Sequence, residues 1–200
     1  MPRDVIEEAG LVRTSWTWER IAIWLVSSTL AYNIAEAGIA LWFGTEAESV
    51  ALVGFGFDSL IETAAAAVVL WRLWLEANGR DRSRIEEMEH RVHRFVGATF
   101  IALATYVTIQ SIWALWGEAT PAESPVGILL AAVSLAIMPL VSLIKLRASR
   151  EIGSPALRAE AKETLACSYL SFTLLVGLGA NATLGWWWAD PTAALLMVPW

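Results

Sequence analysis

The sequence predicts an all-α membrane protein, a six-helix transmembrane bundle whose sixth helix is short. Hydrophobic residues make up 56% of the 200 residues, and the mean hydropathy is +0.53. These values are typical of membrane proteins rather than soluble ones. Apolar segments recur along the chain, and the basic residues are confined to alternate connections between them.

Five apolar segments are long enough to cross a bilayer, which requires about 20 residues. They are residues 21–43, 49–75, 95–116, 127–146 and 165–188. A sixth segment, residues 189–200, has only 12 residues. We expect either that the reading frame is cut short there or that this helix enters the membrane without crossing it.

The basic residues predict the orientation. All 14 Lys and Arg lie before the first segment or at the second-to-third and fourth-to-fifth connections. By the positive-inside rule these regions face the cytosol. We therefore expect a cytoplasmic N-terminal segment (1–20), a transmembrane domain (21–200) with cytosolic basic loops at 76–94 and 147–162, and residence in the cell (inner) membrane.

Composition also argues against several classes of protein. The net charge of −6 and the lack of a basic patch disfavour nucleic acid as a partner. The single Cys167 cannot form an intramolecular disulfide. No nucleophile–base set or motif for a prosthetic group is recognisable, so we do not expect an enzyme.

Asp58 and Glu62 lie in the middle of the second apolar segment. Residues four apart share one face of a helix, and each charge at mid-membrane depth costs about 2.5–3.5 kcal/mol on insertion scales. Two ionised carboxylates this close repel each other, so at least one should hold a proton until a cation displaces it. An ion or proton pathway is the predicted role.

Glu163 and Cys167 have the same four-residue spacing in the fifth segment. Together with Asp58 and Glu62 they make a four-ligand oxygen and sulfur set. A thiolate favours Zn²⁺ over Mg²⁺ and Ca²⁺, although an acidic pair can serve a proton relay instead. The two pairs reach the same depth only if the fifth helix begins near Arg158 or a wet cavity reaches inward, and Ser168 and Ser171 are the fallback partners.

Further polar residues within the segments have structural interpretations. For Asn33 the ordinary explanation is a hydrogen bond between helices. Alternatively, Asn33 and Glu36 line the cavity or carry protons. Asp190, just before Pro191, is expected to be a helix N-cap.

Several motifs resemble the cation diffusion facilitator (cation efflux) family, in a small branch that lacks the C-terminal cytosolic domain. They are Asp58-Ser-Leu-Ile-Glu62, Tyr32-Asn-Ile-Ala-Glu36, Met138-Pro139 and Gly185-Trp-Trp-Trp-Ala-Asp-Pro191. In that family the second and fifth helices each supply a ligand pair for a transported divalent metal, usually zinc. Asp58 and Glu62 match the first pair directly.

The fifth helix departs from the family pattern because it has neither His nor Asp at these positions. Its pair is Glu163 and Cys167 in one register, which we prefer, and Thr164 and Ser168 in the other. Glu36 has no counterpart in the metal site of the best-known members. The resemblance also implies a homodimer, and the small residues at 64–67, Gly177 and Gly179 permit close helix contacts.

The resemblance and the acid pair together predict a proton-coupled exporter of Zn²⁺ or a similar divalent cation, working by alternating access. The cation is the transported substrate, and no prosthetic group is expected. The alternative is a membrane protein that binds metal or regulates a partner without transporting, which a shortened sixth helix would favour.

Overall fold

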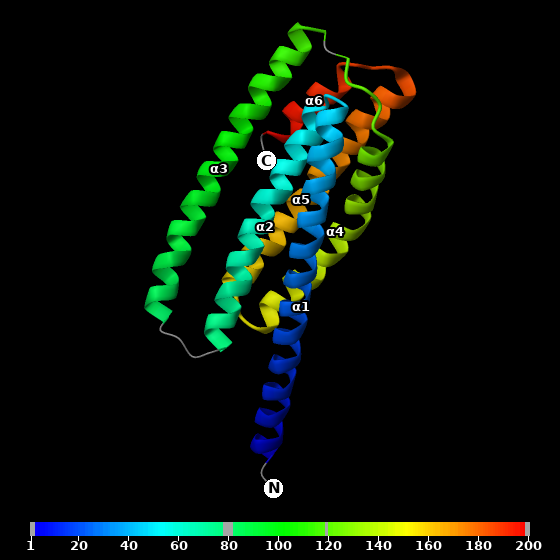
Figure 1. Ribbon diagram of the computed structural model, residues 1–200. Coiled ribbons are helices and arrows are strands. Elements are labelled where there is room, and N and C mark those ends of the chain that lie inside the picture. Colours follow the sequence, from blue (N-terminus) through cyan, green and yellow to red (C-terminus); the bar gives the residue numbers. More distant parts are fainter. Residues whose placement is uncertain (1–2, 78–81, 119, 199–200) are drawn as a thin grey trace.

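The chain folds into a bundle of helices in a computed structural model that describes residues 3–77, 82–118 and 120–198. Within these residues there are six helices and no strand (Figure 1). They are α1 (Arg3–Glu46), α2 (Val50–Ala77), α3 (Arg82–Trp116), α4 (Pro125–Glu151), α5 (Pro155–Leu184) and α6 (Ala189–Met197). The predicted all-α class, with a short sixth helix, is confirmed.

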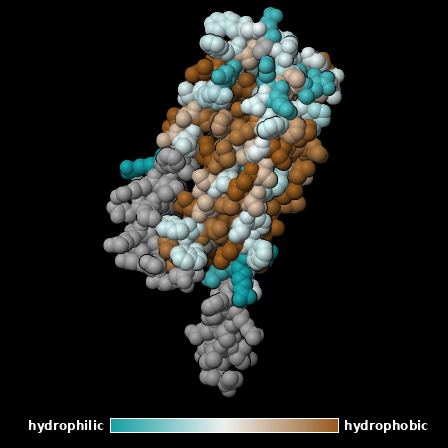
Figure 2. All heavy atoms as spheres, in the orientation of Figure 1, coloured by the Kyte–Doolittle hydropathy of each residue, from teal (hydrophilic) through white to brown (hydrophobic). Residues whose placement is uncertain are grey.

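Four helices are long and apolar enough to cross a membrane, among the residues that the structure describes. The spans are Val50–Arg72, Gly97–Trp116, Pro125–Glu151 and Pro155–Leu184. Hydrophobic side chains cover the middle of the molecule, and hydrophilic ones gather towards its two ends (Figure 2). This distribution suits a protein whose sides contact lipid and whose ends contact water.

The helices extend beyond the predicted apolar segments, because charged turns continue them. α1 runs without a break from Arg3 through the predicted segment 21–43, and its N-terminal part projects beyond the bundle (Figure 1). Most of the predicted loop 76–94 is the start of α3, and the predicted loop 147–162 contains only the turn 152–154 between α4 and α5.

Glycines allow the closest helix contacts. A Cβ on Gly56 of α2 would lie 3.0 Å from the backbone nitrogen of Leu41 in α1, and one on Gly177 of α5 would lie 2.5 Å from the Cβ of Ala193 in α6. Real Cβ atoms essentially never approach as closely as 2.5 Å and rarely as closely as 3.0 Å, so both helix pairs favour glycine at these positions. Gly177 thus permits a contact between two helices of the same chain, whereas a Cβ on Gly179 would meet nothing within 4 Å.

Asp190 caps a different helix from the one expected. It lies in the first turn of α6, but its carboxylate accepts hydrogen bonds from Ser49 Oγ (2.5 Å) and from the backbone N–H of Val50 (2.9 Å) at the start of α2. α6 itself has no side-chain cap at Trp188. The expected cap of the local helix was wrong: Asp190 instead joins α6 to the first N–H groups of α2, which have no partner within their own helix.

α5 begins ten residues before the apolar segment from which it was predicted. Gly153 takes a positive φ of 66°, Ser154 accepts a hydrogen bond from the N–H of Leu157, and Pro155 occupies the first turn. Ser as an N-cap followed by Pro is a strong helix start. Cys167 therefore lies about 18 Å along the helix axis from its start, which places it at mid-bundle depth.

A polar layer crosses the middle of the bundle between two apolar cores. One core includes Leu52, Phe55 and Leu174, and the other includes Val26, Val69 and Leu157. On α2, Asp58 and Glu62 lie between Phe55 of the first core and Ala66 of the second. On α1, Asn33 and Glu36 lie between residue 26 of the second core and residue 40 of the first. Buried polar groups at this depth are costly and normally functional.

Candidate metal site

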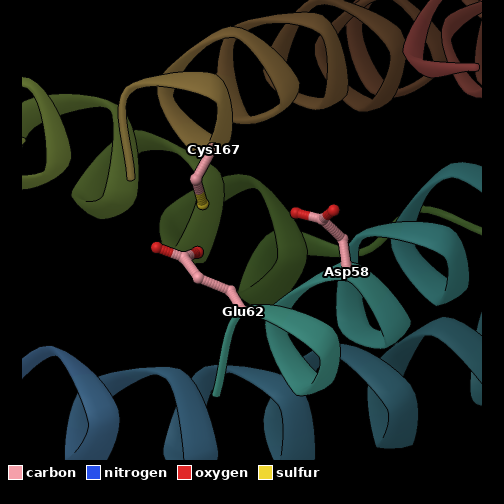
Figure 3. A group of neighbouring side chains, drawn as sticks. All are labelled: Asp58, Glu62 and Cys167. Atoms are coloured by element: carbon pink, nitrogen blue, oxygen red, sulfur yellow. The ribbon is translucent and has the colours of Figure 1, made fainter. Parts of the chain in front are cut away.

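Three of the four predicted ligands meet in the polar layer. Asp58, Glu62 and Cys167 each offer one ligand atom, and these atoms all lie within 4.8 Å of one another. The two carboxylates project from consecutive turns of α2 towards the thiol on α5 (Figure 3). Glu62 is 3% exposed and Cys167 1%. A single cation could contact all three groups after small side-chain movements.

The second predicted residue of α5, Glu163, lies one turn away from this group and outside it. It is half-buried and lines a cavity of about 450 Å³ that also borders Asp58 and Glu62. The other walls are mainly apolar side chains of α2, α3, α5 and the C-terminal end of α6, including Phe55, Leu103, Val107 and Met197. Glu163 and Lys162 are the charged groups on the α5 wall.

The fallback residues of α5, Ser168 and Ser171, do not form an alternative set of ligands. Ser168 Oγ donates to the carbonyl of Thr164 (3.5 Å), and Ser171 Oγ donates to the carbonyl of Cys167 (2.7 Å). Both hydroxyls thus satisfy the backbone of their own helix, a common arrangement for buried serines. Thr164, the first residue of the alternative register, accepts a hydrogen bond from Lys145 and also lies near Glu62.

Glu36 forms a separate buried network with three hydroxyl groups. Its carboxylate accepts hydrogen bonds from Ser59 Oγ (2.9 Å) and from Ser134 Oγ. Tyr32 Oη lies 2.6 Å from Ser134 Oγ, and since the serine proton is used on Glu36, the tyrosine is the donor. Glu36 is therefore held in place by neutral donors from α2 and α4.

Two buried side chains in the layer lack hydrogen-bond partners among the described residues. Both carboxylate oxygens of Glu62 are unpaired, and so are both amide atoms of Asn33, which is fully buried. Buried polar atoms are nearly always paired in folded proteins. Of the two, Glu62 lies beside Asp58 and Cys167, where a bound cation would contact its oxygens.

Sequence reasoning missed a buried ion pair beside this site. Lys145 of α4 is fully buried, although its place at the end of the fourth apolar segment predicts a position at the cytosolic edge. Its Nζ donates to Glu160 Oε1 at 2.5 Å and to Thr164 Oγ1 at 3.0 Å. The helical spacing of the small buried residues Ser134, Ser142 and Ser149 could have placed Lys145 on the inner face of α4.

Comparison with known proteins supports the resemblance. A family model described as the cation efflux transmembrane domain matches residues 25–198. The chain belongs to the cation efflux family. It is therefore an integral membrane protein, and the acidic pair, the thiol and the ion pair all lie within the matched region.

A weaker relative agrees with this assignment. A protein of Synechocystis sp. described as an uncharacterized transporter is 27% identical over 173 residues. The match covers 84% of the present chain and 56% of the relative. The chain thus spans just over half the length of that relative.

Proposed function

We propose that this member of the cation efflux family transports a divalent cation, with Zn²⁺ as the preferred substrate, through a site formed by Asp58, Glu62 and Cys167. The observation that carries the proposal is the convergence of two carboxylates and a thiol within 4.8 Å at mid-bundle depth. Packing does not account for them, because apolar side chains would fill this space without the cost of buried charge.

The donor set favours a borderline-soft metal. Zn²⁺ accepts carboxylate oxygen and thiolate sulfur in tetrahedral coordination, whereas Mg²⁺ and Ca²⁺ prefer oxygen alone. Three protein ligands leave the fourth position for water or for Glu163, which lines the same cavity. An open position allows ligand exchange, which a transport site requires more than a structural site does.

Proton coupling follows from the same ligands. A carboxylic acid or thiol must lose its proton before it can bind the metal, so cation entry at this site releases protons and cation exit takes them up. We infer that the protein exchanges Zn²⁺ for protons. Glu36 and Asn33, on the α1 side of the polar layer, are the proposed route by which protons reach the site.

The cavity beside Asp58 is the proposed entry route. Lys162 and Glu163 line it, and α5 begins at the fourth-to-fifth connection, which the positive-inside rule assigns to the cytosol. In alternating access, closure of this cavity and opening on the opposite side would release the ion outward. The cell (inner) membrane and a homodimer remain part of the same proposal.

The direct test is zinc flux in proteoliposomes that contain the purified full chain. We expect Zn²⁺ to move against its gradient when a proton gradient is imposed, and zinc entry to alkalinise the compartment that zinc enters. Liposomes without protein are the control. Zinc binding without flux would contradict transport and support a binding or regulatory protein instead.

A second test addresses the thiol. Co²⁺ bound in place of Zn²⁺ should show a sulfur-to-cobalt charge-transfer absorption in the near ultraviolet if Cys167 is a ligand. We expect the Cys167→Ser variant to lose this band and to bind Zn²⁺ at least about tenfold more weakly. Loss of a residue that only hydrogen-bonds to a metal ligand already lowers metal affinity by about that factor. An unchanged cobalt spectrum in Cys167→Ser would exclude the thiolate.

A further inference from the structure

Lys145 is the one positive charge that the structure places inside the polar layer, among the residues it describes. Its ammonium has three N–H donors, of which two are directed at Glu160 and Thr164 of α5. It also lies close enough to Glu62 of α2 for a charge interaction. A single cation on α4 therefore faces a carboxylate on each of two other helices.

The two carboxylates are incompletely satisfied. Glu160 Oε2 has no hydrogen-bond partner among the described residues, and neither oxygen of Glu62 has one. Both side chains are almost fully buried, at 1% and 3% exposure. The ammonium thus contacts Glu160 and lies near Glu62, and it could move into contact with Glu62 only by weakening its pair with Glu160.

Glu62 is also the residue for which a substrate cation would compete. A divalent cation at Asp58, Glu62 and Cys167 would repel the Lys145 ammonium, and Glu160 offers that ammonium an alternative partner. When the divalent cation leaves, the same ammonium can move towards Glu62. Other acids near the site do not take this role, since Glu36 is held by Ser59 and Ser134 and Glu163 lines the cavity.

We propose that Lys145 is a tethered competitor of the transported cation, whose position between Glu62 and Glu160 sets the affinity of the site. This inference rests on the proposed transport site. It makes Lys145 and Glu160 determinants of affinity without either being a metal ligand. A competing internal cation would help expel the substrate, because release is then accompanied by a new ion pair.

The proposal predicts shifts of opposite sign in two variants. In Glu160→Gln the ammonium loses its alternative partner and is left to Glu62, so we expect Zn²⁺ to bind about tenfold more weakly. In the double variant Lys145→Met with Glu160→Gln the competitor is absent, so we expect about tenfold tighter binding and a lower maximal flux, since one nearby charge has effects of this order. Titration calorimetry on the detergent-solubilised full chain measures the affinities.

Two further variants make the result decisive. Arg158→Gln removes an exposed positive charge from α5, the helix that carries Glu160, and should leave the affinity within twofold of the native value. Shifts of equal sign in the two test variants, or none, would overturn the competitor role while leaving the transport site intact. Native affinity in Asp58→Asn would instead overturn the transport site itself.

Discussion

Asp58→Asn and Glu62→Gln are each expected to abolish zinc flux in proteoliposomes. Each substitution keeps the size of the side chain but removes a charged ligand from a group whose donor atoms lie within 4.8 Å. Loss of an outer-shell partner already costs a metal site about 10–100-fold in affinity, so the loss of a direct ligand should cost at least about a hundredfold. Zinc binding should fall in parallel with flux.

Matched acids separate the loss of a ligand from the loss of charge. Glu151→Gln removes an exposed carboxylate at the end of α4 and should transport as the native protein does. Glu163→Gln alters the cavity wall outside the three-residue group and should raise the KM for zinc several-fold with little change in kcat. Native flux in both Asp58→Asn and Glu62→Gln would refute the site.

The sequence contains enough information to predict the helices and half of the site. Asp58 and Glu62 stand out because charges inside an apolar segment of α2 are costly, and their four-residue spacing fixes their common face. The partner on α5 depends on where that helix begins. The Ser154-Pro155 start is a local pattern that, read as a helix cap, would have brought Cys167 to the depth of Asp58.

The remaining features depend on contacts between distant parts of the chain. Asp190 was expected to cap the helix in which it lies, but the helix whose N–H groups it binds begins 140 residues earlier in the chain. Lys145 and Glu160 were hidden because charges near a segment end are ordinarily cytosolic, and only the packing of α4 against α5 shows them to be buried. Hydropathy reports the composition of one helix, whereas the Asp190 cap and the Lys145–Glu160 pair depend on which other helices pack against it.

Lys145→Met alone is expected to destabilise the fold strongly. Lys145 is fully buried and pairs with Glu160 at 2.5 Å. Removing one member of a buried ion pair leaves the other charge uncompensated and typically costs about 3–5 kcal/mol. The free energy of unfolding of the full chain, measured in mixed detergent micelles, should fall by about that amount.

Removing both charges should restore most of this loss. The double variant Lys145→Met with Glu160→Gln leaves no unpaired charge in that pair, and replacing a buried pair with neutral side chains is often close to neutral for stability. Equal destabilisation of the single and double variants would show that packing of the lysine chain, rather than its charge, holds α4 against α5. A stable double variant that still binds zinc tightly would instead mean that the buried pair serves ion release more than folding.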